Sequence, residues 1–141
     1  MKPLDKILKK LADEGFRKSE IRKPLLEYFY KSGCAISKIE IEKGLKNQKL
    51  VFNKTTLYRE LNFLKVKNIL RELQFKGERK KRYELADMSH HHHLICQTCN
   101  KIDTLSFNNH LKNEELKCLK DKGFKILSHS LEFFGLCSKC K

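Results

Sequence analysis

Apolar residues in the first half of the chain recur every three to four positions, the spacing of one face of an α-helix. Lysines occupy the opposite faces, so these segments are amphipathic. Capping residues and glycines delimit four helices. The predicted helices span residues 3–14, the stretch from Ser19 as N-cap to Ser32-Gly33, the stretch from Ser37 to around Gly44–Asn47, and a stretch that opens at Asn53.

The fourth predicted helix carries an unusual polar face. At about 100° per residue, Leu57, Leu61 and Leu64 fall on one narrow stripe. The opposite face carries side chains that can contact phosphates or base edges, namely Thr55, Tyr58, Arg59 and Asn62. An ordinary solvated face would carry Glu and Lys instead, so this helix is a candidate recognition helix.

Two β-prone segments follow, Ile69–Phe75 and Arg79–Leu85. The glycine of Lys76-Gly77-Glu78 between them predicts a hairpin, and lysines and arginines crowd its tip. Helices followed by a basic hairpin predict a winged helix-turn-helix. Its recognition helix enters the DNA major groove, and its wing lies along the phosphates, where basic side chains bind any sequence in a salt-sensitive way.

The second half alternates strand and helix patterns. The predicted elements are strands at His93–Cys96 and Ile102–Leu105, a helix at Asn108–Lys122 closed by Gly123, and a long strand at Phe124–Phe134. So small a unit leaves apolar surface exposed as a monomer, which predicts a homodimer built on this half. We therefore predict an α+β protein with a winged-helix domain at 1–85, a hinge at 86–89 and an α/β dimerisation domain at 90–141.

Charge is divided unequally between these halves. The chain carries +14 in all; residues 1–85 hold 23 Lys and Arg against 11 Asp and Glu, and residues 86–141 hold 8 against 6. This asymmetry indicates nucleic acid as the partner of the first half, although a solubilising lysine-rich surface is the alternative. No apolar run approaches the ~20 residues of a membrane span, and no signal-peptide pattern opens the chain, so a cytoplasmic protein is expected.

Cysteine and histidine cluster in the second half. Four of the six histidines are consecutive, and a Cys-x-x-Cys pair follows them; 37 residues separate it from a second such pair. Thiolate and imidazole are preferred ligands of zinc, and two such pairs supply a complete tetrahedral set. On a strand, His91 and His93 face one way while His90 and His92 face the other, so one run can serve two sites. A thiol redox protein and a metal-storage module are alternatives, but neither explains the face that carries Tyr58 and Arg59.

Several motifs together resemble the Fur family of metal-responsive bacterial repressors, of the ferric or zinc uptake regulator type. They are Thr56-Leu57-Tyr58-Arg59, the block His90–Cys99, His129-Ser130-Leu131, and Phe134-Gly135-Leu136-Cys137. The resemblance extends from Gly15 to Cys140 with the same order and spacing. It implies a winged-helix domain, an α/β dimerisation domain, a structural zinc and a regulatory metal between the domains.

The resemblance also implies roles for particular residues. The structural Zn²⁺ ligands are Cys96, Cys99, Cys137 and Cys140. The regulatory Zn²⁺ or Fe²⁺ ligands are Glu84, His91, His93 and Asp103. The ligands of a second site in the dimerisation domain are His90, His92, His110 and His129. The expected DNA contacts are Arg17, Ser19, Arg22, Lys54, Thr55, Thr56, Tyr58, Arg59, Asn62, Lys80 and Lys81.

The chain departs from the family pattern at three places. Ala35, with Cys34 beside it, stands where many relatives have a ligand histidine. Thr104 stands where a carboxylate is expected, and the adjacent Asp103 faces the wrong way unless a bulge turns it. On the following helix His110, Glu114 and Glu115 compete for a ligand position, which we assign to His110.

The function that the resemblance implies is repression rather than catalysis. A homodimer, activated by metal at the hinge, would bind a pseudo-palindromic operator and control metal-homeostasis genes. Cys34 beside Ala35 favours zinc over iron as the signal. A peroxide sensor of the same family is the alternative, and Glu84, where such sensors usually carry Asp, disfavours it.

Overall fold

A computed structural model describes residues 2–88, 91–106, 111–127 and 129–141 of the chain. The chain forms two compact units, Met1–Met88 and Ser89–Lys141. Within the described residues, no helix combines the length and the apolar character that crossing a membrane requires.

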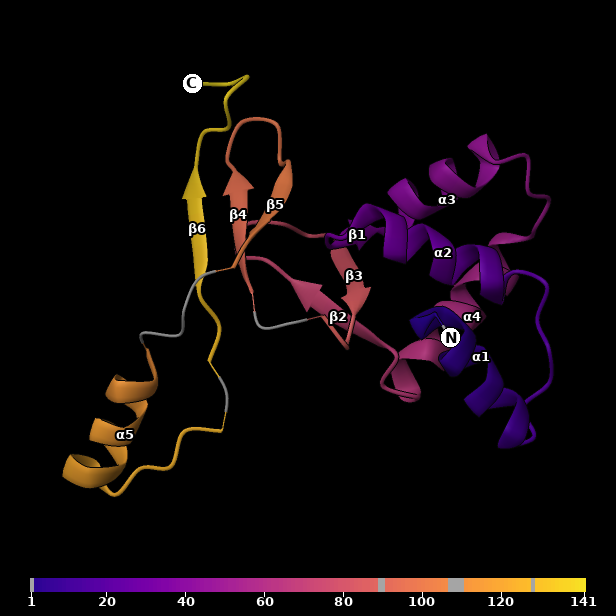
Figure 1. The fold of residues 1–141 in the computed structure, drawn as a ribbon. Helices are drawn as coiled ribbons and strands as arrows, with labels where there is room; N and C mark the ends of the chain where they lie inside the picture. The colour runs from indigo at the N-terminus through magenta and orange to yellow at the C-terminus, as the bar shows by residue number, and fades with distance from the viewer. Residues whose placement is uncertain (1, 89–90, 107–110, 128) are drawn as a thin grey trace. The chain divides into compact units, whose positions relative to one another are not determined.

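The first unit is a winged helix-turn-helix, as predicted (Figure 1). Its helices are α1 (Pro3–Asp13), α2 (Arg22–Ser32), α3 (Lys38–Asn47) and α4 (Lys54–Val66). The predicted N-cap of α3 is correct: the Glu40 N–H donates to Ser37 Oγ at 3.3 Å, and the Ser37 N–H donates to Glu40 Oε2 at 2.8 Å. This reciprocal capping satisfies two backbone donors that the helix end would otherwise leave unpaired.

The prediction that Ser19 caps α2 is wrong. Ile21 is the N-cap, and its side chain forms no capping hydrogen bond. Instead, the Ser19 carbonyl accepts a hydrogen bond from the Arg22 N–H at 3.2 Å, in a turn that precedes the helix. The later start places Pro24 in the first turn of α2, where the missing N–H has no intrahelical partner to lose.

The wing of this unit belongs to a small antiparallel sheet. Its strands are β1 (Ile36–Ser37), β2 (Leu70–Gln74) and β3 (Lys81–Leu85), in the order β1-β3-β2. β2 and β3 pair from Leu70 opposite Leu85 to Gln74 opposite Lys81, so the hairpin is as predicted but shorter in both arms. β1 is too short for sequence periodicity to reveal, and its pairing with β3 attaches the wing to the start of α3.

One hydrophobic cluster holds the first unit together, and the apolar stripes of all four helices contribute to it. Its most buried members, at 0–1% exposure, are Leu25, Leu26, Phe29, Ile41, Leu45, Leu57, Leu61 and Leu64. The stripe predicted for α4 is therefore the core-facing side of that helix.

The second unit is a small α/β unit, also as predicted. Its elements are β4 (His92–Cys96), β5 (Ile102–Leu105), α5 (Leu111–Lys122) and β6 (Glu132–Gly135). The strand order is β5-β4-β6, with β4 antiparallel to β5 and parallel to β6 (Figure 1). Gly123 ends α5 with a φ of 61°, as predicted, whereas the predicted start at Asn108 lies outside the described residues.

The prediction of one long strand at Phe124–Phe134 is wrong, because among the described residues after α5 only Glu132–Gly135 is strand. A strand extends only as far as a neighbour offers backbone hydrogen bonds. Here the neighbour is β4, whose pairing runs from His93 opposite Glu132 to Cys96 opposite Gly135. The alternating apolar pattern before residue 132 therefore did not predict a strand correctly, because the pairing with β4 starts only at Glu132.

We expect the close contact between α2 and α3 to make an alanine at position 44 destabilising. A Cβ on Gly44 would lie 2.3 Å from ring atoms of Tyr28. Gly44→Ala should therefore destabilise the protein by about 1–3 kcal/mol from overpacking, partly offset by the better helix propensity of alanine. Urea unfolding of the full chain, followed by circular dichroism, measures the change.

Tyr28→Ala provides the control for this prediction. In that background the clash is absent, so Gly44→Ala should stabilise by up to about 1 kcal/mol. The same sign in both backgrounds would show that the Tyr28 contact is not the cause.

Candidate metal centres and nucleic-acid interface

Four cysteines meet at one end of the second unit's sheet. Cys96 ends β4, and a turn returns the chain so that the Cys96 N–H donates to the Lys101 carbonyl at 3.0 Å. Cys137 follows β6, whose Gly135 pairs with Cys96 and accepts a hydrogen bond from the Gln97 N–H at 2.8 Å. The parallel pairing of β4 and β6 thus brings together two Cys-x-x-Cys turns that are far apart in sequence.

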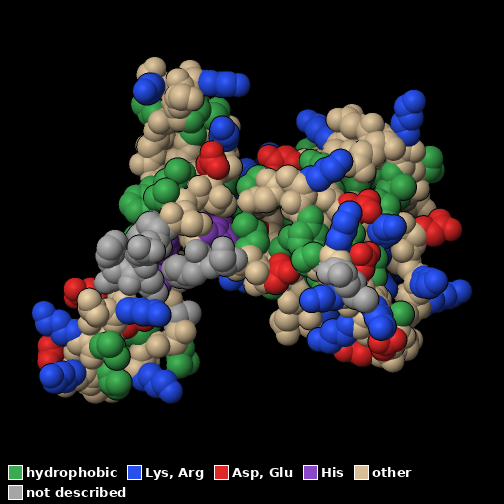
Figure 2. All heavy atoms as spheres, in the orientation of Figure 1, with side chains coloured by type: hydrophobic (Ala, Val, Ile, Leu, Met, Phe, Trp, Pro, Cys, Tyr) green, Lys and Arg blue, Asp and Glu red, His purple; other side chains and the backbone are tan. Residues whose placement is uncertain are grey.

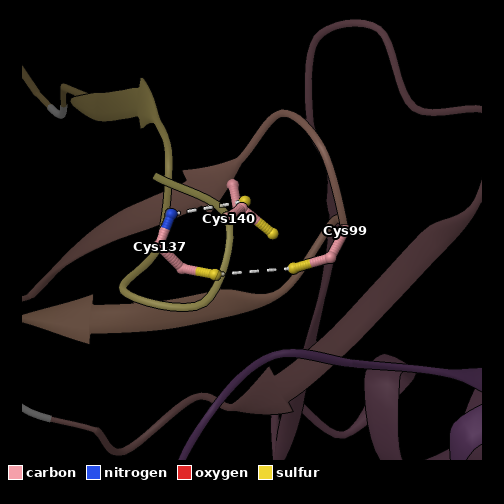
Figure 3. Close-up of side chains that lie close together, drawn as sticks. Cys99, Cys137 and Cys140 are labelled. Atoms are coloured by element: carbon pink, nitrogen blue, oxygen red, sulfur yellow. Dashed lines mark hydrogen bonds between the residues drawn. The ribbon is translucent and has the colours of Figure 1, made fainter.

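The four sulfurs have the spacing of a tetrahedral metal site. All lie within 4.8 Å of one another, and the Cys99 and Cys137 sulfurs are 3.7 Å apart (Figure 3). A tetrahedron with metal–sulfur bonds of about 2.3 Å has sulfur–sulfur edges of about 3.8 Å. A disulfide requires about 2.05 Å, so the geometry fits a shared cation rather than a pair of disulfides.

The electrostatics of this cluster also favour a cation. Backbone N–H groups, first that of Cys99 and then that of Cys137, lower the pKa of the Cys96 thiol to about 6. The Lys139 N–H lowers the pKa of Cys137, whereas hydrogen bonding with Cys137 raises the pKa of Cys140 to about 12. Negative charge therefore forms readily, but each thiolate opposes the next, and only a bound cation makes four thiolates compatible.

The histidines of β4 and the one just before it alternate in direction. The rings of His91 and His93 lie 4.9 Å apart between centroids, in an edge-to-face arrangement. The ring of His92 instead stacks on that of His129, at 5.7 Å between centroids. His90 and His110 lie outside the described residues. The structure thus brings His91 to His93 and His92 to His129.

A carboxylate from α5 joins the second histidine pair. Glu115 Oε1 lies 2.8 Å from His129 Nδ1. Glu115 is one of the three residues that the sequence left in competition, although the assignment went to His110, which lies outside the described residues. The signal was present in the expectation of a carboxylate there, but sequence alone did not show which acid reaches His129.

Asp103 does not lie with His91 and His93. In the β4–β5 ladder, Asp103 pairs with Leu94, and Thr104 pairs with His93. The register advances residue by residue from His92 to Ile95, without the bulge that would turn Asp103 around. Asp103 is instead exposed, 3.9 Å from the Lys101 ammonium.

The remaining regulatory candidates of the first unit lie on or near its sheet. Glu84, on β3, is 1% exposed, and its Oε1 accepts a hydrogen bond from Arg71 at 3.0 Å. Arg71 is the cross-strand partner of Glu84, so the buried carboxylate is charge-compensated within the first unit. Cys34, beside the buried Ala35, packs against the hydrophobic cluster of this unit.

The expected DNA-contact residues lie at the surface of the first unit, with one exception. Those on α4 are all exposed, namely Lys54, Thr55, Thr56, Tyr58, Arg59 and Asn62. Arg17, Lys80 and Lys81 are exposed as well, and Ser19 is half-buried. Lysine and arginine side chains are visible over much of the face of this unit in Figure 2.

The exception is Arg22, which does not face solvent. Its Nε donates to Glu60 Oε1 at 2.5 Å, and its guanidinium lies 4.5 Å from the centroid of the Phe63 ring. Both ends of this ion pair are buried, so Arg22 links α2 to α4 and is not available to a phosphate. The family resemblance gave Arg22 as a DNA contact, and its sequence position did not reveal Glu60 as its partner.

A winged helix-turn-helix joined to a small α/β unit with a four-thiol cluster is the architecture of a metal-responsive transcription regulator. A comparison with protein families identifies which kind. The model of the ferric uptake regulator family matches residues 13–134, and the chain belongs to this family.

Individual relatives cover nearly the whole chain. The ferric uptake regulation protein of Campylobacter jejuni is 30% identical over 140 residues, which are 97% of this chain and 87% of that protein. The peroxide operon regulator of Bacillus subtilis is 28% identical over 137 residues, 97% of this chain and 92% of that protein. The structure of the Helicobacter pylori ferric uptake regulator, which has three functional metal-binding sites, matches with a TM-score of 0.82 at 28% identity, covering 99% and 94% of the two chains.

We expect Cys137→Ser to remove a tightly held zinc and to unfold the second unit. Three thiolates and a serine hydroxyl make a far weaker zinc site, and zinc-binding free energy is folding free energy for small units. Metal analysis after treatment with a mild chelator should find stoichiometric zinc in the wild type and almost none in the variant, together with loss of strand signal in circular dichroism.

Cys118→Ser is the matched control, because Cys118 lies on α5 and outside the cluster. It should retain the zinc and the wild-type spectrum. Zinc retained by Cys137→Ser would contradict the four-thiol assignment.

Proposed function

We propose that this chain is a homodimeric, metal-activated transcriptional repressor that binds a pseudo-palindromic operator and controls metal-homeostasis genes. The observation that carries the proposal is the combination of an exposed recognition face on α4 with separate groups of metal-ligand side chains in the same chain. The metal-responsive regulators of this family provide the context.

DNA binding is assigned to α4 and the wing. α4 would enter the major groove with Thr55, Tyr58, Arg59 and Asn62 toward the bases, while the exposed Lys80 and Lys81 of the wing contact phosphates. The +12 charge of residues 1–85, from 23 basic and 11 acidic side chains, supports this assignment. Arg22 is left out of the contact set because its guanidinium is buried against Glu60.

Three groups of metal-ligand side chains are assigned. The four cysteines hold a structural Zn²⁺. His91 and His93, with Glu84 supplied by the first unit, hold the regulatory Zn²⁺ or Fe²⁺; two imidazoles and a carboxylate suit either metal. His92, His129 and Glu115 form the second site of the dimerisation unit, and their contacts support it. The H. pylori regulator has the same number of functional metal sites.

Regulation follows from where the proposed ligands lie in the sequence. Glu84 is the last residue but one of β3, and His91 follows seven residues later, near the start of the second unit. A metal bound by Glu84, His91 and His93 would fix the two units in one arrangement, and a dimer so fixed would present its two recognition helices at the operator spacing. The metal supplies charge and geometry, and the chain supplies the recognition surface.

A homodimer is assigned to the second unit. Its apolar side chains are exposed on β6 and just beyond it, with Phe133 at 43%, Phe134 at 41% and Leu136 at 56%. β6 ends the strand order β5-β4-β6, so its outer edge can pair with a second copy. Hydrophobic side chains at the surface of this unit are visible in Figure 2.

The switch predicts that operator affinity depends on metal. A duplex enriched from a random library should bind about 5- to 150-fold more tightly to protein loaded with Zn²⁺ or Fe²⁺ than to protein with only the structural zinc, the usual range of allosteric coupling. His91→Ala and Glu84→Gln should abolish the difference, while zinc in the thiol cluster remains. Fluorescence anisotropy at fixed salt measures the affinities.

Glu72→Gln is the control, since it changes a carboxylate of the neighbouring strand β2 that is paired with Lys65 and Lys81. Equal affinity of the metal-loaded and metal-stripped wild type would refute the switch. The peroxide-sensing alternative, raised by the B. subtilis relative, predicts oxidation of His91 or His93 when the Fe²⁺-loaded protein meets peroxide, which mass spectrometry detects.

A further inference from the structure

Two residues of α3 hold Tyr58, the aromatic side chain of the recognition face. The Tyr58 hydroxyl donates to Glu42 Oε1 at 2.8 Å. The Lys38 ammonium lies 4.4 Å from the centroid of the Tyr58 ring, within the range of a cation–π contact. Lys38 and Glu42 are one helical turn apart and therefore point in the same direction from α3. Tyr58 is thus oriented before any DNA arrives.

The hydrogen bond to Glu42 has a fixed direction. An ionised carboxylate has no proton to give, so the single phenol proton points at Glu42. Glu42 is buried at 8% exposure, and its other oxygen lies 3.9 Å from the Lys54 ammonium. The hydrogen bond raises the pKa of Tyr58, so the phenol keeps its proton at neutral pH. Toward solvent, the Tyr58 oxygen can only accept.

We propose that Glu42 determines base specificity by making Tyr58 a hydrogen-bond acceptor on the recognition helix. This inference rests on the proposed binding of DNA by α4. In the major groove only adenine N6 and cytosine N4 carry donor amino groups. Tyr58 therefore selects adenine or cytosine on the strand that it faces. It disfavours guanine and thymine there, because their acceptor oxygens would meet the phenol oxygen, and it gives no hydrogen bond to a phosphate.

Glu42 is a positioning residue in this proposal, because it acts on DNA only through Tyr58. Without the Glu42 carboxylate, the phenol keeps its proton, but its O–H bond is free to rotate toward DNA. The hydroxyl could then donate to guanine O6, thymine O4 or a phosphate as well as accept from an amino group. The selectivity for adenine or cytosine would disappear even though the tyrosine remains.

The test is selection of binding sites from a random duplex library by the full-length, zinc-loaded protein, followed by sequencing. The wild type should enrich a motif with adenine or cytosine at one position of each half-site, by about two- to tenfold over guanine or thymine, the worth of one net hydrogen bond. Tyr58→Phe and Glu42→Ala should both lose the preference at that position and keep the rest of the motif.

Glu72→Gln is the matched control, because it removes one acidic charge from the first unit without contacting Tyr58. It should leave the base preference at every position unchanged, which separates a general charge effect from the specific one. Thermal melting of each variant identifies a loss of folding. Tyr58→Phe removes one oxygen only and keeps the test informative if Glu42→Ala unfolds.

Three results would overturn the proposal. Tyr58→Phe could enrich the wild-type motif unchanged, the position that it relaxes could prefer guanine or thymine in the wild type, or a folded Glu42→Ala could keep the preference. In each case the protein still selects a motif, so the proposed function stands while the role of Glu42 fails. A wild type that enriches no motif overturns both.

Discussion

Four sulfurs within 4.8 Å of one another are the constraint on which the second unit depends. Among its described residues, the buried apolar side chains are Ile95, Cys96 and Ile102, too few for a self-sufficient core. The sulfurs lie where β4 and β6 end, so a cation that binds them ties together two strands distant in sequence. Metal binding then supplies stability that apolar burial does not.

The same short strand carries ligands in several directions. β4 ends in a cysteine of the thiol cluster, and His92 faces His129 while His93 faces His91. Side chains alternate along a strand, so five residues can serve separate sites without sharing an atom. Because these ligands share one strand, a shift of β4 moves ligands of every site at once. A metal bound at the thiol cluster would therefore also restrict the positions of the histidines.

The features that could be predicted from sequence are those that depend on nearby residues in the chain. The Ser37 cap, the stop at Gly123 and the thiol cluster follow from residue type and spacing, and the winged helix follows from periodicity and a hairpin turn. What sequence missed depended on tertiary partners. The strand predicted before residue 132 would have needed a neighbouring strand, and the pairing with β4 begins only at Glu132. Arg22 pairs with Glu60, and Glu115 contacts His129; neither partner could be chosen from sequence spacing alone.

The two units differ in what metal can do for them. The first has a continuous core from four helices, and its recognition face is held by internal contacts such as those of Lys38 and Glu42 with Tyr58. None of these contacts involves a residue of the thiol or histidine clusters. The surface that we propose reads DNA bases therefore needs contacts of the first unit only. In the proposed dimer, we infer that metal acts by placing two such surfaces relative to each other, and not by changing the shape of either.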